Sequence, residues 1–241
     1  FRPGSGSQPC ARGWRACHGS LAAAPARRHG GSSQPQQPRP RELSHRSTLM
    51  KTTILNGGLN GDRFTDHIQR LLQAELGDNG GDATVWTLRD EKIAYCLGCF
   101  DCWTKTPGIC RIDDAGRDVA ASIIASDLVV FLTPVTFGGY SSELKKAVDR
   151  SICLISPFFT RIDDEVHHQR RYDRYPAMLA IGILPEQNPE QEAIFTTLVE
   201  RHAINLHAPQ HAAVVVMRSQ DEQTLRSVLH AALPARETER Q

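Results

Sequence analysis

The chain has 241 residues, of which 40% are hydrophobic and 23% are charged, and its formal net charge is +1. Such a composition is typical of a globular protein long enough to bury a core. The near-neutral charge gives no electrostatic reason to expect nucleic acid as a partner, and no apolar run approaches the roughly 20 residues that span a bilayer. We therefore expect a soluble, cytoplasmic protein that binds neither nucleic acid nor a membrane.

The first 49 residues differ from the rest of the chain. They are rich in Gly, Pro, Ser, Gln and Arg, and Glu42 is their only acid. A segment without apolar periodicity cannot offset the entropy that it would lose on ordering. An Arg-rich, acid-poor stretch also suits a targeting peptide, but this one lacks the apolar core of a secretory signal. We expect residues 1–49 to be disordered and one domain to span residues 50–235.

Apolar and β-branched runs predict five buried strands in the remaining chain, at 51–58, 83–88, 127–135, 177–184 and 212–217. Segments with helical spacing of apolar residues alternate with these runs, at 62–80, 115–126, 141–155, 188–204 and about 220–232. Helix starts are indicated by Asp113 or Asp114, by Ser141 or Ser142, and by Pro189. Residues 156–176 are polar and are expected to be irregular.

Five strands that alternate with helices predict a parallel sheet covered by helices on both faces. We therefore expect an α/β fold of the flavodoxin-like type, a three-layer sandwich around a five-stranded parallel sheet with strand order 2-1-3-4-5. In such a sheet a ligand binds beyond the carboxyl ends of the first and third strands, where the strand order reverses.

Glycine-rich loops follow both of those strands. "NGGLNGDRFTD" follows the first, and its glycines and the helix start provide backbone N–H groups that suit a phosphate. "TPVTFGGYSSELK" follows the third, where the paired glycines allow a flat ring to approach the main chain and an aromatic side chain can stack on that ring. Two such loops at the two required places predict a nucleotide or flavin site.

Four cysteines lie within fifteen residues, with the spacing C-x2-C-x2-C-x7-C: Cys96, Cys99, Cys102 and Cys110. Thiolates at this spacing can each bind one corner of an iron–sulfur cluster. Four thiolates also suit a structural zinc ion, although zinc ribbons usually divide their ligands into two separated pairs. A third interpretation is a set of buried or redox-active thiols without a metal. The spacing leaves these three interpretations open, whereas a disulfide framework is not expected in an α/β domain of this size.

The stretch "CLGCFDCWTKTPGICRIDD", followed by "SDLVVFLTPVTFGGYSSELKKAVDR", resembles the NADPH-dependent FMN reductase and flavodoxin-like oxidoreductase family, and within it the iron–sulfur flavoproteins. The resemblance covers roughly residues 50–217 and is strongest over 93–152. It implies a noncovalent FMN, hydride transfer from NAD(P)H, and homodimers or homotetramers with the flavin near a subunit interface.

The resemblance also implies roles for particular residues. The FMN phosphate would lie on the loop after the first strand, at Gly58, Asn60, Gly61 and Thr65. The isoalloxazine ring would contact the loop after the third strand, at Pro134, Val135, Thr136, Phe137, Gly138, Gly139 and Tyr140. A [4Fe–4S] cluster would be bound by Cys96, Cys99, Cys102 and Cys110. The chain departs from the family pattern at Asp62, which would repel a phosphate, and at "GILPEQN", which lacks the glycine-rich turn of many members.

We expect an FMN-dependent NAD(P)H oxidoreductase that passes electrons to a quinone, to another small acceptor or to the cluster. Hydride transfer requires no acid–base side chain, so no catalytic residue is predicted. The alternatives are a flavodoxin-type electron carrier without a small substrate of its own, and a cysteine-based sensor of metal or oxidation.

Other features carry weaker expectations. The basic residues between the third helix and the fourth strand either meet a phosphate as a lid or form a solvated loop: His167, His168, Arg170, Arg171 and Arg174. Cys153 is expected to be a small buried residue. One helix face is expected to be exposed and ion-paired, with a packing role below the flavin loop implied by the resemblance: Lys145, Lys146, Asp149 and Arg150. The run "ISPFF" at 155–159 is expected in a pocket, a subunit interface or the core.

Overall fold

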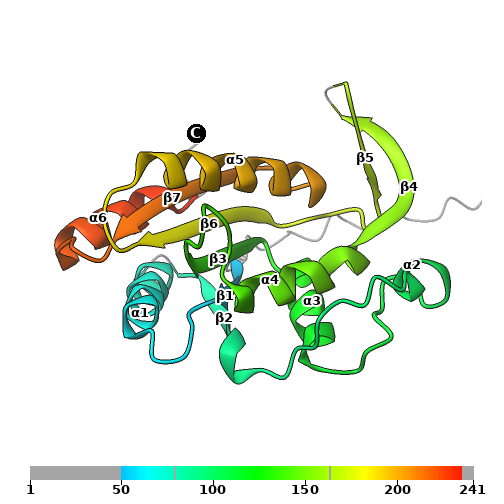
Figure 1. Cartoon of the computed structure of the whole chain (residues 1–241), viewed down its shortest axis with the longest axis horizontal. Helices are drawn as coiled ribbons and strands as arrows, with labels where there is room; N and C mark the ends of the chain where they lie inside the picture. The colour runs from blue at the N-terminus through cyan, green and yellow to red at the C-terminus, as the bar shows by residue number, and fades with distance from the viewer. Residues whose placement is uncertain (1–49, 79, 163, 235–241) are drawn as a thin grey trace, which may run out of the picture. The chain divides into compact units, whose positions relative to one another are not determined.

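The computed structural model describes residues 50–78, 80–162 and 164–234. The predicted disorder of residues 1–49 lies outside the described residues. Five of the described strands form one parallel sheet: β1 (Lys51–Asn56), β2 (Asp82–Thr87), β3 (Leu128–Pro134), β6 (Ala177–Leu184) and β7 (His211–Met217). Their order is β2-β1-β3-β6-β7 (Figure 1). Numbered within this sheet alone, that order is 2-1-3-4-5, so the predicted fold class is confirmed.

Helices cover the sheet on both faces. The longer helices are α1 (Arg63–Asp78), α3 (Ala115–Ala125), α4 (Ser142–Arg150), α5 (Pro189–Asn205) and α6 (Glu222–Ala232). Apolar side chains of α1 and α6 pack on one face of the sheet, and those of α3, α4 and α5 pack on the other. Neighbouring residues of β3 point to opposite faces of the sheet. Val130 packs in the core under α1 and α6, and Phe131 packs in the core under α3, α4 and α5. This division produces the three predicted layers.

The predicted helix starts are confirmed. Asp114 caps α3, because its Oδ1 accepts a hydrogen bond from the N–H of Gly116 at 3.0 Å. Ser141 caps α4 by accepting from the N–H of Leu144 at 3.2 Å. Pro189 opens α5, where its missing N–H leaves no hydrogen bond unmade.

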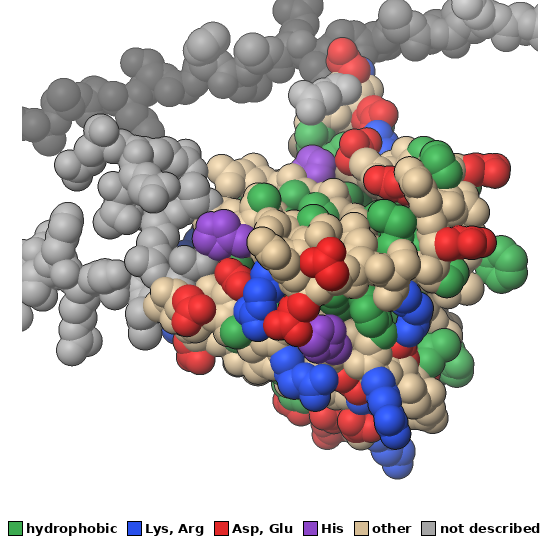
Figure 2. Space-filling view, turned by 90° about the vertical axis from the view of Figure 1, so that its left-hand side faces the viewer, with side chains coloured by type: hydrophobic (Ala, Val, Ile, Leu, Met, Phe, Trp, Pro, Cys, Tyr) green, Lys and Arg blue, Asp and Glu red, His purple; other side chains and the backbone are tan. Residues whose placement is uncertain are grey.

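The side of the molecule that bears α1 and α6 carries interspersed acidic and basic side chains (Figure 2). Arg226 and His230 of α6 lie 3.4 and 3.3 Å from carboxylate oxygens of Glu75 in α1. Mixed charge on this side agrees with the net charge of +1. None of the helices in the described part of the chain combines the length and apolar character needed to cross a membrane.

The segment between α4 and β6 corrects a prediction. Residues 156–176 were expected to be irregular from sequence, and this is wrong for most of the segment: β4 (Ile155–Ile162) and β5 (Glu165–Arg170) form an antiparallel hairpin. The hairpin projects away from the parallel sheet (Figure 1). Phe158 and Phe159 of the "ISPFF" run are 68% and 62% exposed, so these two rings are not part of the core.

Polar side chains anchor the hairpin to the domain. The buried ring of His167 lies 3.0 Å from Asn205 Oδ1, at the end of α5, and 3.0 Å from Glu165 Oε2. His207 Nε2 donates to the carbonyl oxygen of His168 at 2.7 Å. The histidines of the basic segment therefore hold a strand in position.

The arginines of this segment also bind the protein itself. Arg171 Nε donates to the carbonyl oxygen of Cys153 at 3.0 Å, and Arg174 pairs with Asp127 at 2.6 Å. The expectation of a solvated basic loop is thus wrong for Arg171, which is half-buried, whereas Arg174 is exposed as expected. Both guanidinium groups have partners other than a phosphate.

Aromatic rings connect the hairpin to the cysteine segment. The ring centroid of His168 lies 4.8 Å from that of Trp103 and 4.8 Å from that of Phe159. Trp103 in turn stacks on Phe100 at 5.1 Å, and its indole N–H donates to the carbonyl oxygen of Ile152 at 3.1 Å. These contacts fix the short helix α2 (Asp101–Thr104) against the base of the hairpin.

Candidate functional site

The loops after β1 and β3 are joined where the strand order reverses. The N–H of Gly57 donates to the carbonyl oxygen of Leu132 at 2.8 Å, and the carbonyl oxygen of Gly57 accepts from Ser141 Oγ at 2.6 Å. A Cβ atom at position 57 would lie 2.7 Å from the Cβ atom of Leu144. Only glycine allows this close approach, which brings the two predicted ligand loops together at one edge of the sheet.

The loop after β3 turns sharply and exposes its tip. Thr136 and Gly139 exchange backbone hydrogen bonds of 3.0 and 2.9 Å. The two residues between them have positive φ angles, 51° at Phe137 and 76° at Gly138, which is the pattern of a type I′ turn. Phe137 is 95% exposed although its left-handed backbone is unfavourable for a side chain. Backbone strain of this kind is found most often at active sites and ligand-binding sites.

The other predicted ring contacts in this loop differ in accessibility. Thr136 is exposed like Phe137, Pro134, Val135 and Gly139 are half-buried, and Gly138 is buried. Tyr140 points inward: its hydroxyl lies 3.1 Å from His202 Nδ1, and its ring meets Phe131 and Phe195 edge-on. Tyr140 therefore supports the loop from within the domain, whereas Phe137 is available at the surface.

Burial controls the charge of His202 beneath this loop. Desolvation lowers the pKa of His202 to about 4; the positive charge of Lys145 lowers it further and the negative charge of Asp149 opposes it. Because the ring has a pKa near 6.5 in an unfolded chain, the unfolded state binds the proton more readily than the folded state does. The stabilising effect of the neutral ring is complete above pH 6.5 and declines as the pH falls towards 4.

We expect the free energy of unfolding to fall by about 2 kcal/mol between pH 6.5 and pH 5 through this residue. Carboxylates contribute little in that interval, because they ionise at lower pH. Urea unfolding at several pH values would measure the fall. The variant His202→Gln should have a flatter profile over the same interval, and an unchanged slope in the variant would contradict the assignment.

The loop after β1 is partly engaged within the protein. The N–H of Gly58 donates to Asn56 Oδ1 at 2.8 Å, and the buried hydroxyl of Thr65 donates to Asp62 Oδ2 at 2.5 Å. Asn60 and Gly61 are exposed. Of the four predicted phosphate contacts, these two are open to a ligand, whereas the polar groups of Gly58 and Thr65 have partners already.

Asp62 occupies the start of α1. Its carboxylate accepts from the N–H of Thr65 at 3.3 Å and pairs with Arg218 at 2.9 Å. Burial raises the pKa of Asp62, but the hydrogen bonds from Thr65 and Arg218 outweigh it and hold the pKa below its usual range. The positive end of the α1 dipole and the guanidinium of Arg218 therefore interact with the carboxylate of Asp62, where a phosphate would otherwise bind. On the ring side Thr136 and Phe137 are exposed, and on the phosphate side the turn at Asn60 and Gly61 is exposed.

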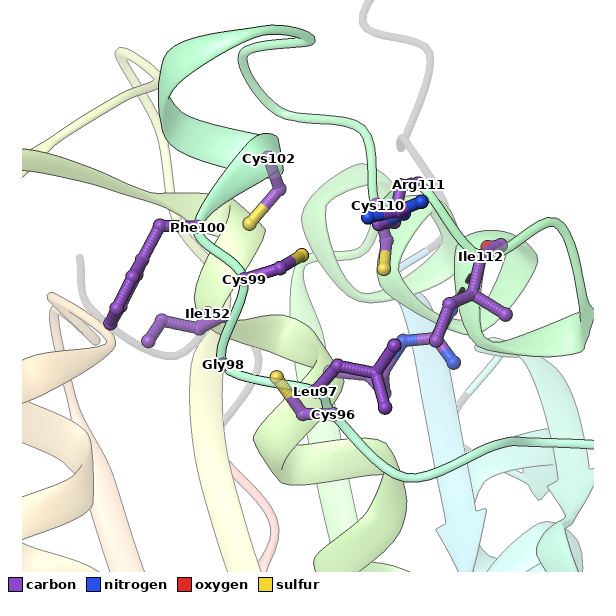
Figure 3. A pocket seen from close by; sticks show the side chains of 11 residues that line it. Cys96, Leu97, Gly98, Cys99, Phe100, Cys102, Cys110, Arg111, Ile112 and Ile152 are labelled. Carbon is purple, nitrogen blue, oxygen red and sulfur yellow. Dashed lines mark hydrogen bonds between the residues drawn. The ribbon is translucent and has the colours of Figure 1, made fainter.

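The four cysteines of the predicted cluster motif surround one pocket (Figure 3). Gly98 and Phe100 have φ angles of 62° and 58°, and these two left-handed residues curl the chain between the first three cysteines. Cys96 and Cys99 are exposed, Cys110 is half-buried and Cys102 is buried in α2. All five cysteines in the described part of the chain are free thiols.

The thiols are close enough to influence one another. Burial raises the pKa of Cys102, and the charges of Cys110, Cys96 and Cys99 raise it further. Thiolates repel one another unless a cation lies among them, and a metal binds them only in the deprotonated form. The pocket therefore favours a positively charged metal group and would release protons on binding it.

The spacing of these groups bears on which metal fits. Among the described residues, no group of three or more Cys, His, Asp or Glu side chains has the geometry to hold a single metal ion. A zinc ion would need every sulfur within about 2.3 Å of one point. In a cluster each cysteine binds a different iron, so the sulfurs stand farther apart. The four thiols around the pocket are the donor set that an iron–sulfur cluster takes.

The helix face that was expected to be exposed divides into two parts. Lys145 pairs with Asp149 at 2.5 Å, and Lys146 pairs with Glu143 at 2.7 Å. Arg150 differs: it is 2% exposed and lies in the wall of the cysteine pocket. The expectation of an exposed Arg150 is wrong, and no sequence spacing indicated its contact with the cysteines.

Cys153 is buried as predicted and lies outside the residues that line the pocket. Burial raises the pKa of its thiol to about 11, with further contributions from Cys102 and Cys110. Cys153 therefore remains a neutral thiol and is a natural control for the four pocket cysteines.

The chain resembles known proteins in sequence and in fold. A family model described as NADPH-dependent FMN reductase matches residues 50–184, more than half of the chain. The chain is 28% identical over 102 residues to an iron–sulfur flavoprotein of Methanocaldococcus jannaschii and 30% identical over 102 residues to one of Archaeoglobus fulgidus. These alignments cover 42% of this chain, and 52% and 49% of those proteins. The chain thus spans about half the length of these curated relatives.

A solved structure shares the fold more widely. The NAD(P)H:quinone oxidoreductase from Methanothermobacter marburgensis matches with a TM-score of 0.56 and 13% identity, over 76% of this chain and 92% of that one. At this identity the likeness concerns the fold alone. The sheet order and the extent of the family match lead to one conclusion: the chain belongs to the NADPH-dependent FMN reductase family.

Proposed function

We propose that this protein is an FMN-dependent NAD(P)H oxidoreductase that delivers electrons to a small acceptor such as a quinone. We also propose that Cys96, Cys99, Cys102 and Cys110 hold an iron–sulfur cluster. The observation that carries the proposal is the meeting of four thiols at one pocket, in a chain whose family is defined by FMN reduction. The relatives named iron–sulfur flavoproteins support the same combination.

FMN, when bound, supplies hydride acceptance from a nicotinamide and electron transfer to the next acceptor. The protein's part is to bind and orient the ring. Thr136 and Phe137 at the exposed turn are the side chains available to lie against a flat ring. Asn60 and Gly61 are the matching contacts for the phosphate, and the engaged groups of Gly58 and Thr65 shape the loop from beneath.

The hairpin supports a proposal about assembly. A two-stranded hairpin is marginally stable alone in water, and this one exposes Phe158, Phe159 and Val166. Burial of these side chains against another subunit would stabilise the hairpin. We therefore propose a homodimer or homotetramer, in keeping with the exposed apolar residues.

Absorption spectroscopy tests the central proposal. Anaerobically purified protein should carry flavin bands together with the broad visible absorbance of an iron–sulfur cluster, and NADH or NADPH should bleach the flavin bands. A quinone added afterwards should restore them. Iron and zinc counts on the same sample identify the metal.

Each result has a separate meaning. Colourless protein that does not bind added FMN in a titration would overturn the flavin assignment. Flavin that neither NADH nor NADPH reduces would favour an electron carrier that depends on partner proteins. Flavin without iron would leave the reductase and remove the cluster.

A further inference from the structure

Among the fully buried side chains of the described residues, that of Arg150 is the largest, and it is charged. Its side chain is 1% exposed. It is the last residue of α4. Its Nη1 and Nη2 atoms lie 2.9 and 2.8 Å from the two carboxylate oxygens of Asp114, whose side chain is 7% exposed. A buried ion pair persists only where hydrogen bonds satisfy the remaining polar atoms, so the other partners of this guanidinium are informative.

The ion pair joins the two ends of the cysteine loop, the segment from Cys96 to Cys110, and we call this junction the neck of the loop. Nη1 of Arg150 also donates to the carbonyl oxygen of Ala94 at 3.0 Å, and Nη2 donates to the carbonyl oxygen of Ile112 at 3.1 Å. Asp114 Oδ2 accepts from the N–H of Ala94 at 2.9 Å. Ala94 precedes Cys96, and Ile112 follows Cys110. One ion pair therefore ties together the two ends of the segment that carries all four pocket thiols.

One donor of Arg150 is left over. Its Nε atom is buried and has no hydrogen-bond partner among the described residues. A buried N–H without a partner costs about 1–3 kcal/mol, and such an exception calls for an explanation. Arg150 and Cys110 both line the cysteine pocket, so the spare donor belongs to a side chain that faces the proposed cluster.

Cys110 has two arginine neighbours. Arg117 Nε donates to the carbonyl oxygen of Cys110 at 2.7 Å and thereby fixes the backbone at this position. Arg150 lies with Cys110 in the wall of the pocket.

We propose that Arg150 is a positioning residue for the cluster, which closes the cysteine loop at its neck and donates its Nε–H to the sulfur of Cys110 when the cluster is bound. This rests on the proposed function. Reduction of a cluster adds one electron and no atoms, and in the proposed reaction the reduced flavin is the electron donor. A hydrogen bond to a ligating sulfur stabilises the more negative, reduced form. Arg150 thereby raises the reduction potential of the cluster.

The variant Arg150→Lys tests this role. A lysine keeps the charge beside Asp114 but has no donor at the Nε position. We expect its cluster, measured on the protein that contains iron, to be about tenfold harder to reduce, which is about 59 mV for a one-electron couple. A potentiometric titration followed by electron paramagnetic resonance of the reduced cluster measures the shift. Arg117→Lys is the matched control: it alters a contact to the same cysteine without removing the spare donor, and its potential should remain that of the wild type.

A second variant keeps the test decisive if Arg150→Lys does not fold. Arg150→Met combined with Asp114→Asn removes the buried pair as a neutral unit, which proteins often tolerate, and it should shift the potential in the same direction. Full iron content with the wild-type potential in both the Arg150→Lys and the double variant would overturn the inference. Wild-type protein without iron would instead overturn the proposed cluster, so the two failures are distinguishable.

Discussion

Replacing Cys99 with serine is expected to remove iron from the purified protein while FMN remains bound. Cys99 is exposed and lies between Cys96 and Cys102 around the pocket, so its loss removes one ligand without opening the core. A serine hydroxyl does not ionise near neutral pH as a thiol does, and it is a poor ligand for a cluster that is held by thiolates. We expect the iron content to fall from about four atoms per chain, the complement of one [4Fe–4S] cluster, to nearly none.

Cys153→Ala is the control for this experiment. Cys153 is 2% exposed and is not part of the pocket lining. Its replacement should lower the free energy of unfolding by about 1 kcal/mol through a small cavity and leave the iron content unchanged. Iron that persists in Cys99→Ser protein, or that disappears equally in both variants, would contradict the assignment of Cys99 as a ligand.

Gly138→Val is expected to weaken FMN binding about 100-fold, which corresponds to about 2.8 kcal/mol. The backbone at Gly138 has a φ angle of 76°, and a Cβ atom there would lie 2.4 Å from Ile194 Cγ2. A branched side chain in the left-handed conformation is unfavourable by itself, typically by about 1–2 kcal/mol. The collision adds to this strain, so the turn that carries Phe137 must move. Quenching of flavin fluorescence during a titration with FMN measures the affinity.

Gly98→Ala separates backbone strain from the collision. Gly98 has a similar φ angle of 62°, and a Cβ atom there would meet no described atom within 4 Å. Gly98 lies in the cysteine loop and not in either predicted flavin loop, so this variant should bind FMN as the wild type does. Equal affinity of Gly138→Val and wild-type protein for FMN would exclude the turn after β3 as the ring contact.

The parallel sheet could be predicted because its strands are apolar and β-branched runs, which can be identified from the sequence of each strand alone. Leu128 to Leu132 of β3 are all at most 2% exposed, and such a continuous run is typical of a strand covered on both faces. The hairpin could not be predicted in this way. Its inward side chains include Ser156 and His167, and the contacts that hold β5 are polar bonds to Asn205 and His207. A hydrophobic pattern carries no record of such bonds.

The candidate site was also only partly predictable. The spacing of the cysteines and the glycines of the two loops indicated where ligands would bind, because these features are local in sequence. The pairing of Arg150 with Asp114 joins positions 36 residues apart. From sequence Asp114 is predicted only as a helix cap, because the residues around it in the sequence do not indicate its ion pair with Arg150. The same limit applies to Asp62, whose partner Arg218 follows β7.

The closure of the cysteine loop by Arg150 and Asp114 has a consequence for the life of the protein in the cell. In a zinc finger the ligand-bearing segment acquires its shape from the metal, and removing the metal unfolds the chain. Here side-chain and backbone hydrogen bonds already join the ends of that segment. Loss of the proposed cluster should therefore leave a folded apoprotein that can take up iron again when supply returns.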